Sequence, residues 1–332
     1  MTEAGTTTID EGGSAYGRVM RARFASFAQR QGALIALVAV CVFAAIRYER
    51  FLTEENLVNV LRQNSMLGLV ALGMTFVILT GGIDLSVGSL MAVAGVAAAS
   101  LAGRGVLVAV LAAVALTTVL GFVNGVFIAK ARIQPFIVTL AMMIAARGLV
   151  LAYTKEKSVG IGRSSEWLRW LGTGFVGPVP IPVVFLIIAF AVGWLVLNHT
   201  RFGRHVYALG DNDEAARLMG LNTGRVTIGV YALSGALSGL AGVLDAARLG
   251  AGRPVAGTGD ELNAIAAVVV GGTLLTGGQG SVLATLVGVL LLGLIFNVLN
   301  FEGDISIWWQ TVLRGVFLLL VVIVQNRLSK RK

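Results

Sequence analysis

Apolar runs of helical length recur along almost the whole chain, separated by mostly short polar segments. A helix needs about 20 predominantly apolar residues to cross a bilayer. Ten runs approach that length, namely residues 32–46, 66–80, 85–101, 106–128, 136–153, 183–198, 226–243, 263–276, 282–299 and 306–325. The pattern predicts an all-α polytopic membrane protein with about ten transmembrane helices, whose ends are set to within about four residues.

Composition supports this fold class and excludes two ordinary soluble domains. Hydrophobic residues make up 56% of the 332 residues and charged residues only 13%, whereas a soluble domain carries about 25% charged residues. Such a chain has too few polar side chains to cover a surface in water, so lipid is its solvent. The 43 glycines fit close helix packing within a bilayer.

The distribution of Lys and Arg predicts the orientation. With the amino terminus inside, the inner segments carry 14 basic residues and the outer segments ten, as the positive-inside rule favours. The same rule explains the net charge of +9 without a nucleic-acid partner. We expect cytoplasmic N- and C-termini, with a cytosolic tail at 1–31, a transmembrane domain at 32–326 that includes a polar inner loop at 199–225, and a basic cytosolic tail at 327–332.

The stretch 52–64, which precedes the second apolar run, has a different pattern. Leu57, Val60 and Leu61 recur at helical spacing among polar residues, which is typical of an amphipathic helix at a membrane surface. We therefore expect a short helix that lies on the outer face.

Internal symmetry is indicated by two sets of recurring motifs. Thr80-Gly81-Gly82 recurs six runs later as Thr276-Gly277-Gly278, whereas Asn124 recurs five runs later as Asn297. The second spacing favours a five-plus-five inverted repeat of the kind common in transporters. The first spacing disagrees with it, so the period stays open.

A short capped helix is predicted inside the polar inner loop. Asp211 or Asn212 is a good N-cap, Asp213 and Glu214 suit the positive end of the helix dipole, and Gly220 supplies a stop. Between them lie the helix-forming residues Ala215, Ala216, Leu218 and Met219. The residues alone fit either a docking helix that projects into the cytosol or a simple connection between two spans.

A glycine-broken helix with an acidic residue is predicted near the middle of the membrane, at Thr80-Gly81-Gly82-Ile83-Asp84-Leu85-Ser86. A charge at that depth is costly and is usually paired or functional. Asp84 therefore either caps the following helix, with help from Ser86, or contacts a transported solute, and the two roles are compatible.

Several runs in order resemble the ribose-type permeases, the monosaccharide subgroup of ABC importer permeases, from about residue 55 to 325. The matching runs are Asn59 to Asn64, Leu79 to Ser89, Asn124-Gly125, Gln134 to Leu140, Arg147-Gly148, Gly210 to Gly220 and Gly271 to Ser281. Within them, Glu214-Ala215-Ala216 followed by Gly220 is similar to the coupling-loop signature of ABC importer permeases. The Ile-x-Leu-Pro part that normally follows is missing near Val230, which fits the sugar subgroup better than the wider family.

The resemblance implies a permease subunit that pairs with a second permease subunit and works by alternating access. It implies that the helix 211–220 docks on a cytosolic ABC ATPase subunit, which binds ATP and magnesium, and that an extracytoplasmic sugar-binding protein delivers the solute. The solute would be a monosaccharide, either a ribose-like pentose or a hexose.

Polar side chains at or inside the ends of the spans are candidates for the solute path. Neutral amides and hydroxyls bind sugar hydroxyls without fixing an ion, and each also has the alternative of an interhelical hydrogen bond. The candidates are Asn64, Thr80, Asp84, Ser86, Asn124, Thr139, Asn297 and Gln310. Arg147 and Arg314 lie in the outer halves of their helices and are expected to pair or to snorkel instead.

The sequence gives no sign of catalysis. The Gly277–Ser281 run lacks the lysine of a phosphate-binding loop, and two histidines and one cysteine make a metal cluster improbable. We expect no enzyme, no metal and no cofactor in this chain.

Besides a non-transporting membrane scaffold, two further classes remain as alternatives. One is a permease of the same superfamily for a branched-chain amino acid, a nucleoside or a signalling furanose. The other is an ion-coupled secondary transporter, for which Asp84 is the main support because that class relies on intramembrane carboxylates.

Overall fold

A computed structural model gives the structure of residues 32–162 and 165–301, with the single positions 306, 309, 312, 313, 315, 316 and 319. A first helix spans Gly32–Arg47. The other helices are α2 (Glu54–Leu79), α3 (Val87–Leu101), the 3-10 helix η1 (Ala102–Arg104), α4 (Val106–Lys130), α5 (Pro135–Thr154), α6 (Glu166–Thr173), α7 (Ile181–His199), α8 (Arg201–Asp211), α9 (Asp213–Leu218), α10 (Thr223–Leu249), α11 (Asp260–Val270) and α12 (Val282–Phe301). The strands are β1 (Val159–Gly160), β2 (Phe175–Val176), β3 (Val179–Pro180) and β4 (Ala251–Gly252).

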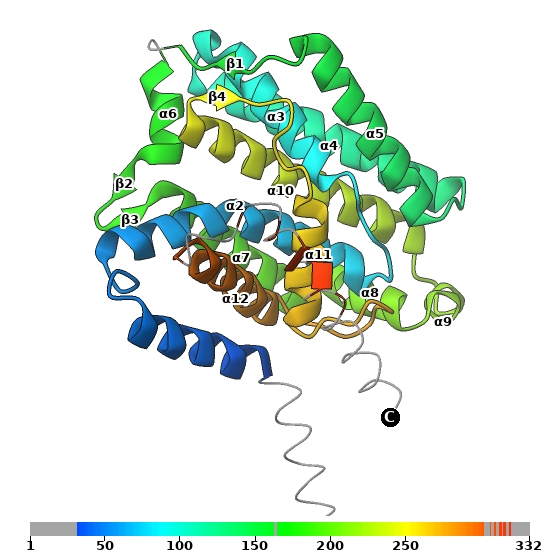
Figure 1. Ribbon diagram of the computed structural model, residues 1–332. Coiled ribbons are helices and arrows are strands. Elements are labelled where there is room, and N and C mark those ends of the chain that lie inside the picture. The colour runs from blue at the N-terminus through cyan, green and yellow to red at the C-terminus, as the bar shows by residue number, and fades with distance from the viewer. Residues whose placement is uncertain are drawn as a thin grey trace, which may run out of the picture.

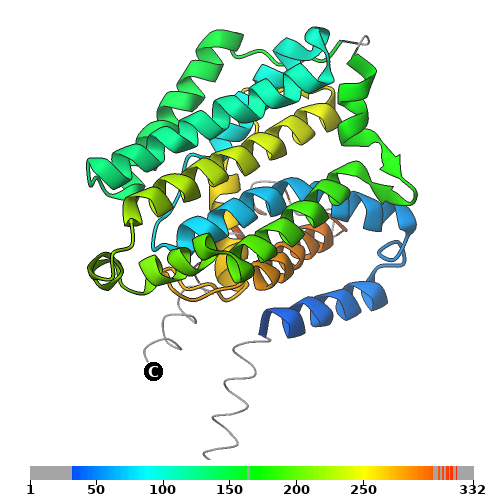
Figure 2. The ribbon, with the colours of Figure 1, turned by 180° about the vertical axis from the view of Figure 1, so that it is seen from behind.

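The long helices form two layers that run in roughly the same direction (Figure 1). One layer contains α3, α4, α5 and α10, and the other contains α2, α7 and α12. Helix α10 packs on α3, α4 and α2 and so joins the layers, while α11 packs on α2 and α12. The opposite view shows the same order (Figure 2).

The two ends of the bundle differ. Helix α6 and two antiparallel two-stranded sheets, β1 with β4 and β2 with β3, lie at one end, here named the α6 end. Helices α8 and α9 lie at the opposite end, named the α9 end (Figures 1 and 2).

Apolar side chains are distributed as in a membrane protein. Helices α4, α5 and α7 expose large residues such as Leu111, Leu149 and Ile187, which would be costly in water and suits lipid. Helices α2 and α3 are mostly enclosed by their neighbours. Local signals in the sequence fix several helix ends: Pro135 begins α5, Asn222 caps α10 by accepting from Arg225 N, and Gly250 ends α10 at φ +71°.

Seven of the described helices are long and apolar enough to cross a membrane, which confirms a polytopic helical protein but not the full number of ten. The first run forms a shorter apolar helix of 16 residues, Gly32–Arg47. The predicted span at 263–276 is wrong as a full crossing, because α11 has only 11 residues and its helix ends before the Gly271-Gly272 turn. Both tails and Arg314 lie outside the described residues, and so does most of the predicted span at 306–325.

The expectation of a separate surface helix at 52–64 is also wrong. Thr53 caps a single 26-residue helix, α2, that continues without a break to Leu79. No glycine or proline interrupts residues 54–66, so nothing separates the polar turns from the apolar ones. Their polar face lines a pocket between helices.

The polar inner loop 199–225 is more ordered than predicted. It contains the amphipathic helix α8 as well as the short helix α9. Thr200 caps α8 by accepting a hydrogen bond from Gly203 N at 3.2 Å.

Candidate functional site

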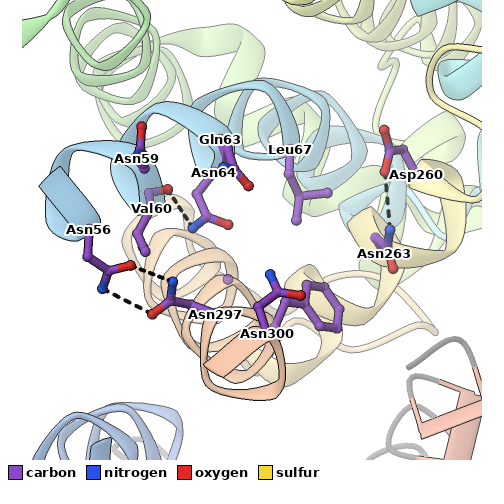
Figure 3. Close-up of a pocket in the computed structure, with 12 residues that line it drawn as sticks. Asn56, Asn59, Val60, Gln63, Asn64, Leu67, Asp260, Asn263, Asn297 and Asn300 are labelled. Atoms are coloured by element: carbon purple, nitrogen blue, oxygen red, sulfur yellow. Dashed lines mark hydrogen bonds between the residues drawn. The ribbon is translucent and has the colours of Figure 1, made fainter. Parts of the chain in front are cut away.

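A polar pocket of about 370 Å³ lies between α2, α11 and α12 (Figure 3). It occupies the half of the bundle toward the α6 end, since it is lined by the first turns of α2 and the last turns of α12. The residues that line it are Asn56, Asn59, Val60, Gln63, Asn64, Leu67, Asp260, Asn263, Gly293, Phe296, Asn297 and Asn300. On α2 these positions recur every three or four residues, so a single helix face supplies them.

Local contacts arrange the amides at one end of this pocket. Asn56 Nδ2 donates to Asn297 Oδ1 at 3.2 Å, and Asn297 Nδ2 donates back to Asn56 Oδ1 at 2.8 Å. Asn64 Nδ2 donates to the Val60 carbonyl of its own helix at 2.8 Å. A Cβ at Gly293 would overlap the Asn64 amide, so glycine is what lets this amide lie against α12.

The lining suits a neutral solute that carries hydroxyl groups. Seven of its twelve residues are Asn or Gln, and each amide offers both donors and acceptors. Leu67 and Phe296 add apolar surface for the carbon face of a ring. The volume lies within the range of about 300–1,000 Å³ that is usual for small-molecule sites.

The structure brings together two of the predicted path residues, Asn64 and Asn297, in this pocket. The sequence reasoning missed Asn56, Asn59, Gln63, Asp260, Asn263 and Asn300. The spacing of the polar residues from 56 to 64 was the available signal, and it was attributed to a membrane surface.

A second polar region surrounds Asp84 in the turn between α2 and α3. Asp84 Oδ1 accepts from Ser86 N at 3.0 Å and from Ser86 Oγ at 2.6 Å, and Oδ2 accepts from Ser234 Oγ of α10 at 2.8 Å. Asn124 of α4 donates to Ser86 Oγ at 3.1 Å. All four residues are fully buried, so this Asp84 network ties the turn to two other helices.

The remaining predicted path residues lie outside the pocket. Thr139 of α5 donates to the Ile83 carbonyl at 3.2 Å and so belongs beside the Asp84 network. Thr80 donates to the Val77 carbonyl at the end of α2. Gln310 lies outside the described residues.

The predicted helix near Glu214 is present as α9, with Asn212 as its cap. Asn212 Oδ1 accepts from Ala215 N at 2.9 Å, and Asp213 pairs with Arg217 at 2.7 Å. Asp211 is the last residue of α8, and Gly220 follows α9 at φ +82°, where a side chain would be strained.

The surface of α9 is apolar at its far edge. Leu218 is 84% exposed and Met219 is 71% exposed, while Ala216 is buried against the bundle. Two large apolar side chains on a projecting helix suit a protein partner.

Glycines connect α8 to the helices that form the pocket. A Cβ at Gly210 would overlap the Leu79 carbonyl, and one at Gly277 would lie 2.8 Å from Gly81 N and 3.0 Å from the Gly210 carbonyl. Gly278 N donates to the Leu79 carbonyl at 3.0 Å. At this glycine junction, the main chain of α8 therefore contacts the end of α2 and the loop between α11 and α12.

Comparisons with known proteins match nearly the whole chain. Residues 56–322 match the family described as branched-chain amino acid transport system / permease component. The ribose import permease protein of Escherichia coli strain K12 is 47% identical over 301 residues, which cover 90% of this chain and 94% of that protein.

More distant relatives cover similar shares. The ribose import permease protein of Bacillus subtilis strain 168 is 40% identical over 93% of this chain and 96% of its own length. The D-allose transport system permease protein of Escherichia coli strain K12 is 35% identical over 92% of this chain and 94% of its own length. No solved structure matches significantly. These matches confirm the resemblance that the motifs indicated.

Proposed function

The chain belongs to the permease family described as branched-chain amino acid transport system / permease component, and on that premise we propose that it imports a monosaccharide. It is the transmembrane subunit of an ABC importer, a multi-pass protein of the bacterial inner membrane. Relatives named for ribose and D-allose transport support the class of solute. A ribose-like pentose or a hexose is the expected cargo.

One observation carries the choice of cargo: the pocket between α2, α11 and α12 is lined mainly by neutral amides, with Asp260 as its one charged residue among those described. None of the twelve described residues around it is Lys, Arg or His. An amino acid brings a carboxylate that needs a cationic or strongly donating partner, whereas sugar hydroxyls pair well with amides. The lining therefore favours a sugar over the branched-chain amino acid in the family description.

The α9 end is proposed to face the cytoplasm and to bind a separate ABC ATPase subunit, where ATP and magnesium are held. Leu218 and Met219 supply the apolar contact on α9. This chain contributes no catalytic residue in this arrangement. Its role is to convert closure of the ATPase into a change of access.

The glycine junction supports a route for that conversion. Helix α8 follows α7 and leads into α9, and it contacts the end of α2 and the loop between α11 and α12 at Gly210. Helices α2, α11 and α12 are the ones that form the pocket. A displacement of α9 therefore acts on all walls of the pocket together, which is what alternating access requires.

The remaining partners follow from the same proposal. An extracytoplasmic sugar-binding protein releases the sugar at the α6 end, close to the pocket. A second permease subunit, either identical or related, completes the path, and lipid covers the exposed faces of α4, α5 and α7.

Transport in a reconstituted complex tests the proposal. The full chain is co-purified with the ATPase from its own host, placed in vesicles with ATP inside, and supplied outside with binding protein and labelled D-ribose. We expect uptake that depends on ATP and persists with a proton uncoupler. Competition by unlabelled D-allose but not by leucine supports the sugar class. Uptake of leucine in place of sugar, or collapse of uptake with the uncoupler, contradicts the proposal.

A further inference from the structure

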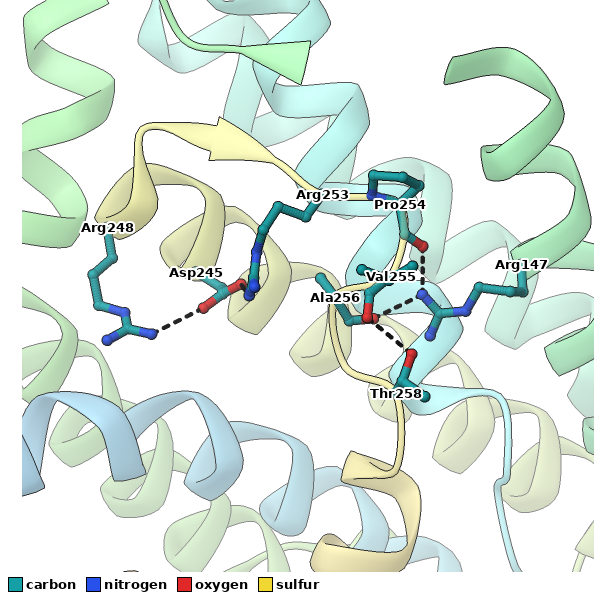
Figure 4. A network of polar contacts seen from close by, with 8 residues as sticks. All are labelled: Arg147, Asp245, Arg248, Arg253, Pro254, Val255, Ala256 and Thr258. Atoms are coloured by element: carbon teal, nitrogen blue, oxygen red, sulfur yellow. Dashed lines mark hydrogen bonds and ion pairs between the residues drawn. The ribbon is translucent and has the colours of Figure 1, made fainter. Parts of the chain in front are cut away.

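The segment 250–259 joins α10 to α11 (Figure 4). It packs against α3 through β4, and the next residue, Asp260, lines the pocket. Gly252 and Gly257 lie against the main chain of α3. A Cβ at Gly252 would lie 2.7 Å from the Val96 Cα, and one at Gly257 would lie 2.5 Å from the Gly88 carbonyl. Main-chain contact of this kind holds the segment close to α3.

One end of the segment is tied to α10 by an ion pair. Arg253 lies 3.1 Å from the Asp245 carboxylate, which Arg248 also approaches at 3.4 Å. These groups are partly exposed, so their contribution to stability is small.

The other end is held by Arg147, which reaches across from α5. Its Nη1 donates to the carbonyls of Pro254 and Ala256 at 2.6 Å and 2.8 Å. Thr258 Oγ1 donates a hydrogen bond to the intervening Val255 carbonyl at 2.8 Å. Three consecutive carbonyls are therefore bonded by side chains, and Arg147 is directed at the segment rather than at lipid.

The same arginine interacts with the start of α11. Its charge attracts the carboxylates of Glu261 and Asp260. Burial raises the pKa of Glu261, and the Arg147 charge acts in the opposite direction. Asp260 and Asn263 are joined by a 3.1 Å hydrogen bond and form the α11 side of the pocket.

We propose that Arg147 is a positioning residue for the sugar pocket. By holding the Pro254 and Ala256 carbonyls it fixes where α11 begins, and so where Asp260 and Asn263 face the solute. Its hydrogen bonds to the Pro254 and Ala256 carbonyls act on the segment, and its charge attracts Asp260 at the start of α11. The proposal rests on the proposed function, because it takes the pocket as the sugar site.

Thiol labelling measures the position of this wall directly. Asn263→Cys is introduced with Cys41→Ala in the full chain, assembled with its ATPase in membranes, and the rate of reaction with a polar maleimide is recorded. We expect Arg147→Met to change this rate by about fivefold, the factor that corresponds to one lost net hydrogen bond. Arg147→Lys keeps a donor group and is expected to stay within about twofold.

Arg104→Met is the matched control. It removes an exposed arginine of η1 and is expected to leave the rate at residue 263 unchanged. If Arg147→Met does not assemble, Arg147→Gln is compared with the parent instead. Its labelling rate is expected to lie between the parent rate and the rate expected for Arg147→Met. An unchanged rate in assembled Arg147→Met, or in Arg147→Gln where Arg147→Met does not assemble, overturns the proposal.

Transport kinetics separate positioning from a general loss of structure. We expect Arg147→Met to raise the KM for D-ribose by about fivefold with the maximal rate within about twofold, and to add nothing further when combined with Asn263→Ala. Full additivity with Asn263→Ala contradicts action through the wall. If D-ribose does not slow labelling of the Asn263→Cys parent, the pocket is not the sugar site. The difference in labelling rate between the parent and Arg147→Met still decides whether Arg147 positions α11.

Discussion

The pocket and the Asp84 network are both polar regions within the helix bundle, and they differ in how far their side chains are exposed. In the network, Asp84, Ser86, Asn124 and Ser234 are fully buried and bonded to one another. In the pocket, amides such as Gln63 remain exposed to the cavity. The difference indicates that the first region holds the fold, whereas the second is available to a solute.

The largest effect is expected from Asp84→Ala. It leaves Ser86 N, Ser86 Oγ and Ser234 Oγ without their acceptor, at about 1 kcal/mol or more each, so unfolding should become easier by about 3 kcal/mol. Thermal unfolding of the purified protein in detergent measures this. A folded Asp84→Ala protein that has lost only transport would reverse the assignment of the two regions.

Glu214→Lys tests for a loss of transport that leaves the fold of the chain intact. It reverses a charge in the first turn of α9, outside both polar regions, and like charges at an interface cost several kcal/mol. We expect uptake to fall by about tenfold or more, with normal amounts of folded protein and no stimulation of the ATPase. Normal uptake would show that α9 does not couple the two subunits.

Gln63→Leu and Asn124→Leu each remove an amide from one of the two regions. Gln63→Leu is expected to lower uptake by about fivefold, the effect of one lost hydrogen bond to the solute, with little change in unfolding temperature because the Gln63 side chain is exposed to the cavity. Asn124→Leu is expected to lower the unfolding temperature, with uptake following the amount of folded protein. Equal effects on stability in both variants would remove the distinction between pocket and network.

The smallest effect is expected from Asp84→Asn. Its Oδ1 still accepts from Ser86, and its amide can donate to Ser234 Oγ, so the change should cost about 1 kcal/mol or less. Initial rates of uptake should equal those of the parent. A large loss of uptake with unchanged stability would place Asp84 in the solute path.

Several features of the fold were predictable because their signals are local. The cap at Asn212, the acidic first turn of α9 and the glycine after it together determine a short helix. Helix α8 was missed because its low hydropathy resembles a loop, and only packing on the bundle makes it helical. Helix α11 was predicted as a crossing because an apolar run does not reveal that its helix ends at Val270, before the Gly271-Gly272 turn.

The candidate site was predicted only in part, for a physical reason. Hydropathy shows that Asn64, Asn124 and Asn297 lie within apolar surroundings, but not whether a neighbouring helix supplies a partner. Ser86 does so for Asn124, whereas Asn64 donates to the Val60 carbonyl of its own helix and lines the pocket. Such distinctions depend on contacts between segments far apart in the chain.

The glycine junction at Gly81, Gly210 and Gly277 has a consequence for mechanical stiffness. Side chains absorb a displacement by changing rotamer, since their torsions have several accessible minima. Main chain in direct contact with main chain has no such freedom, because peptide planes and bond angles resist distortion. A displacement of α8 is therefore transmitted to the end of α2 and to the loop before α12 with little loss, because the main-chain contacts at this junction are stiff.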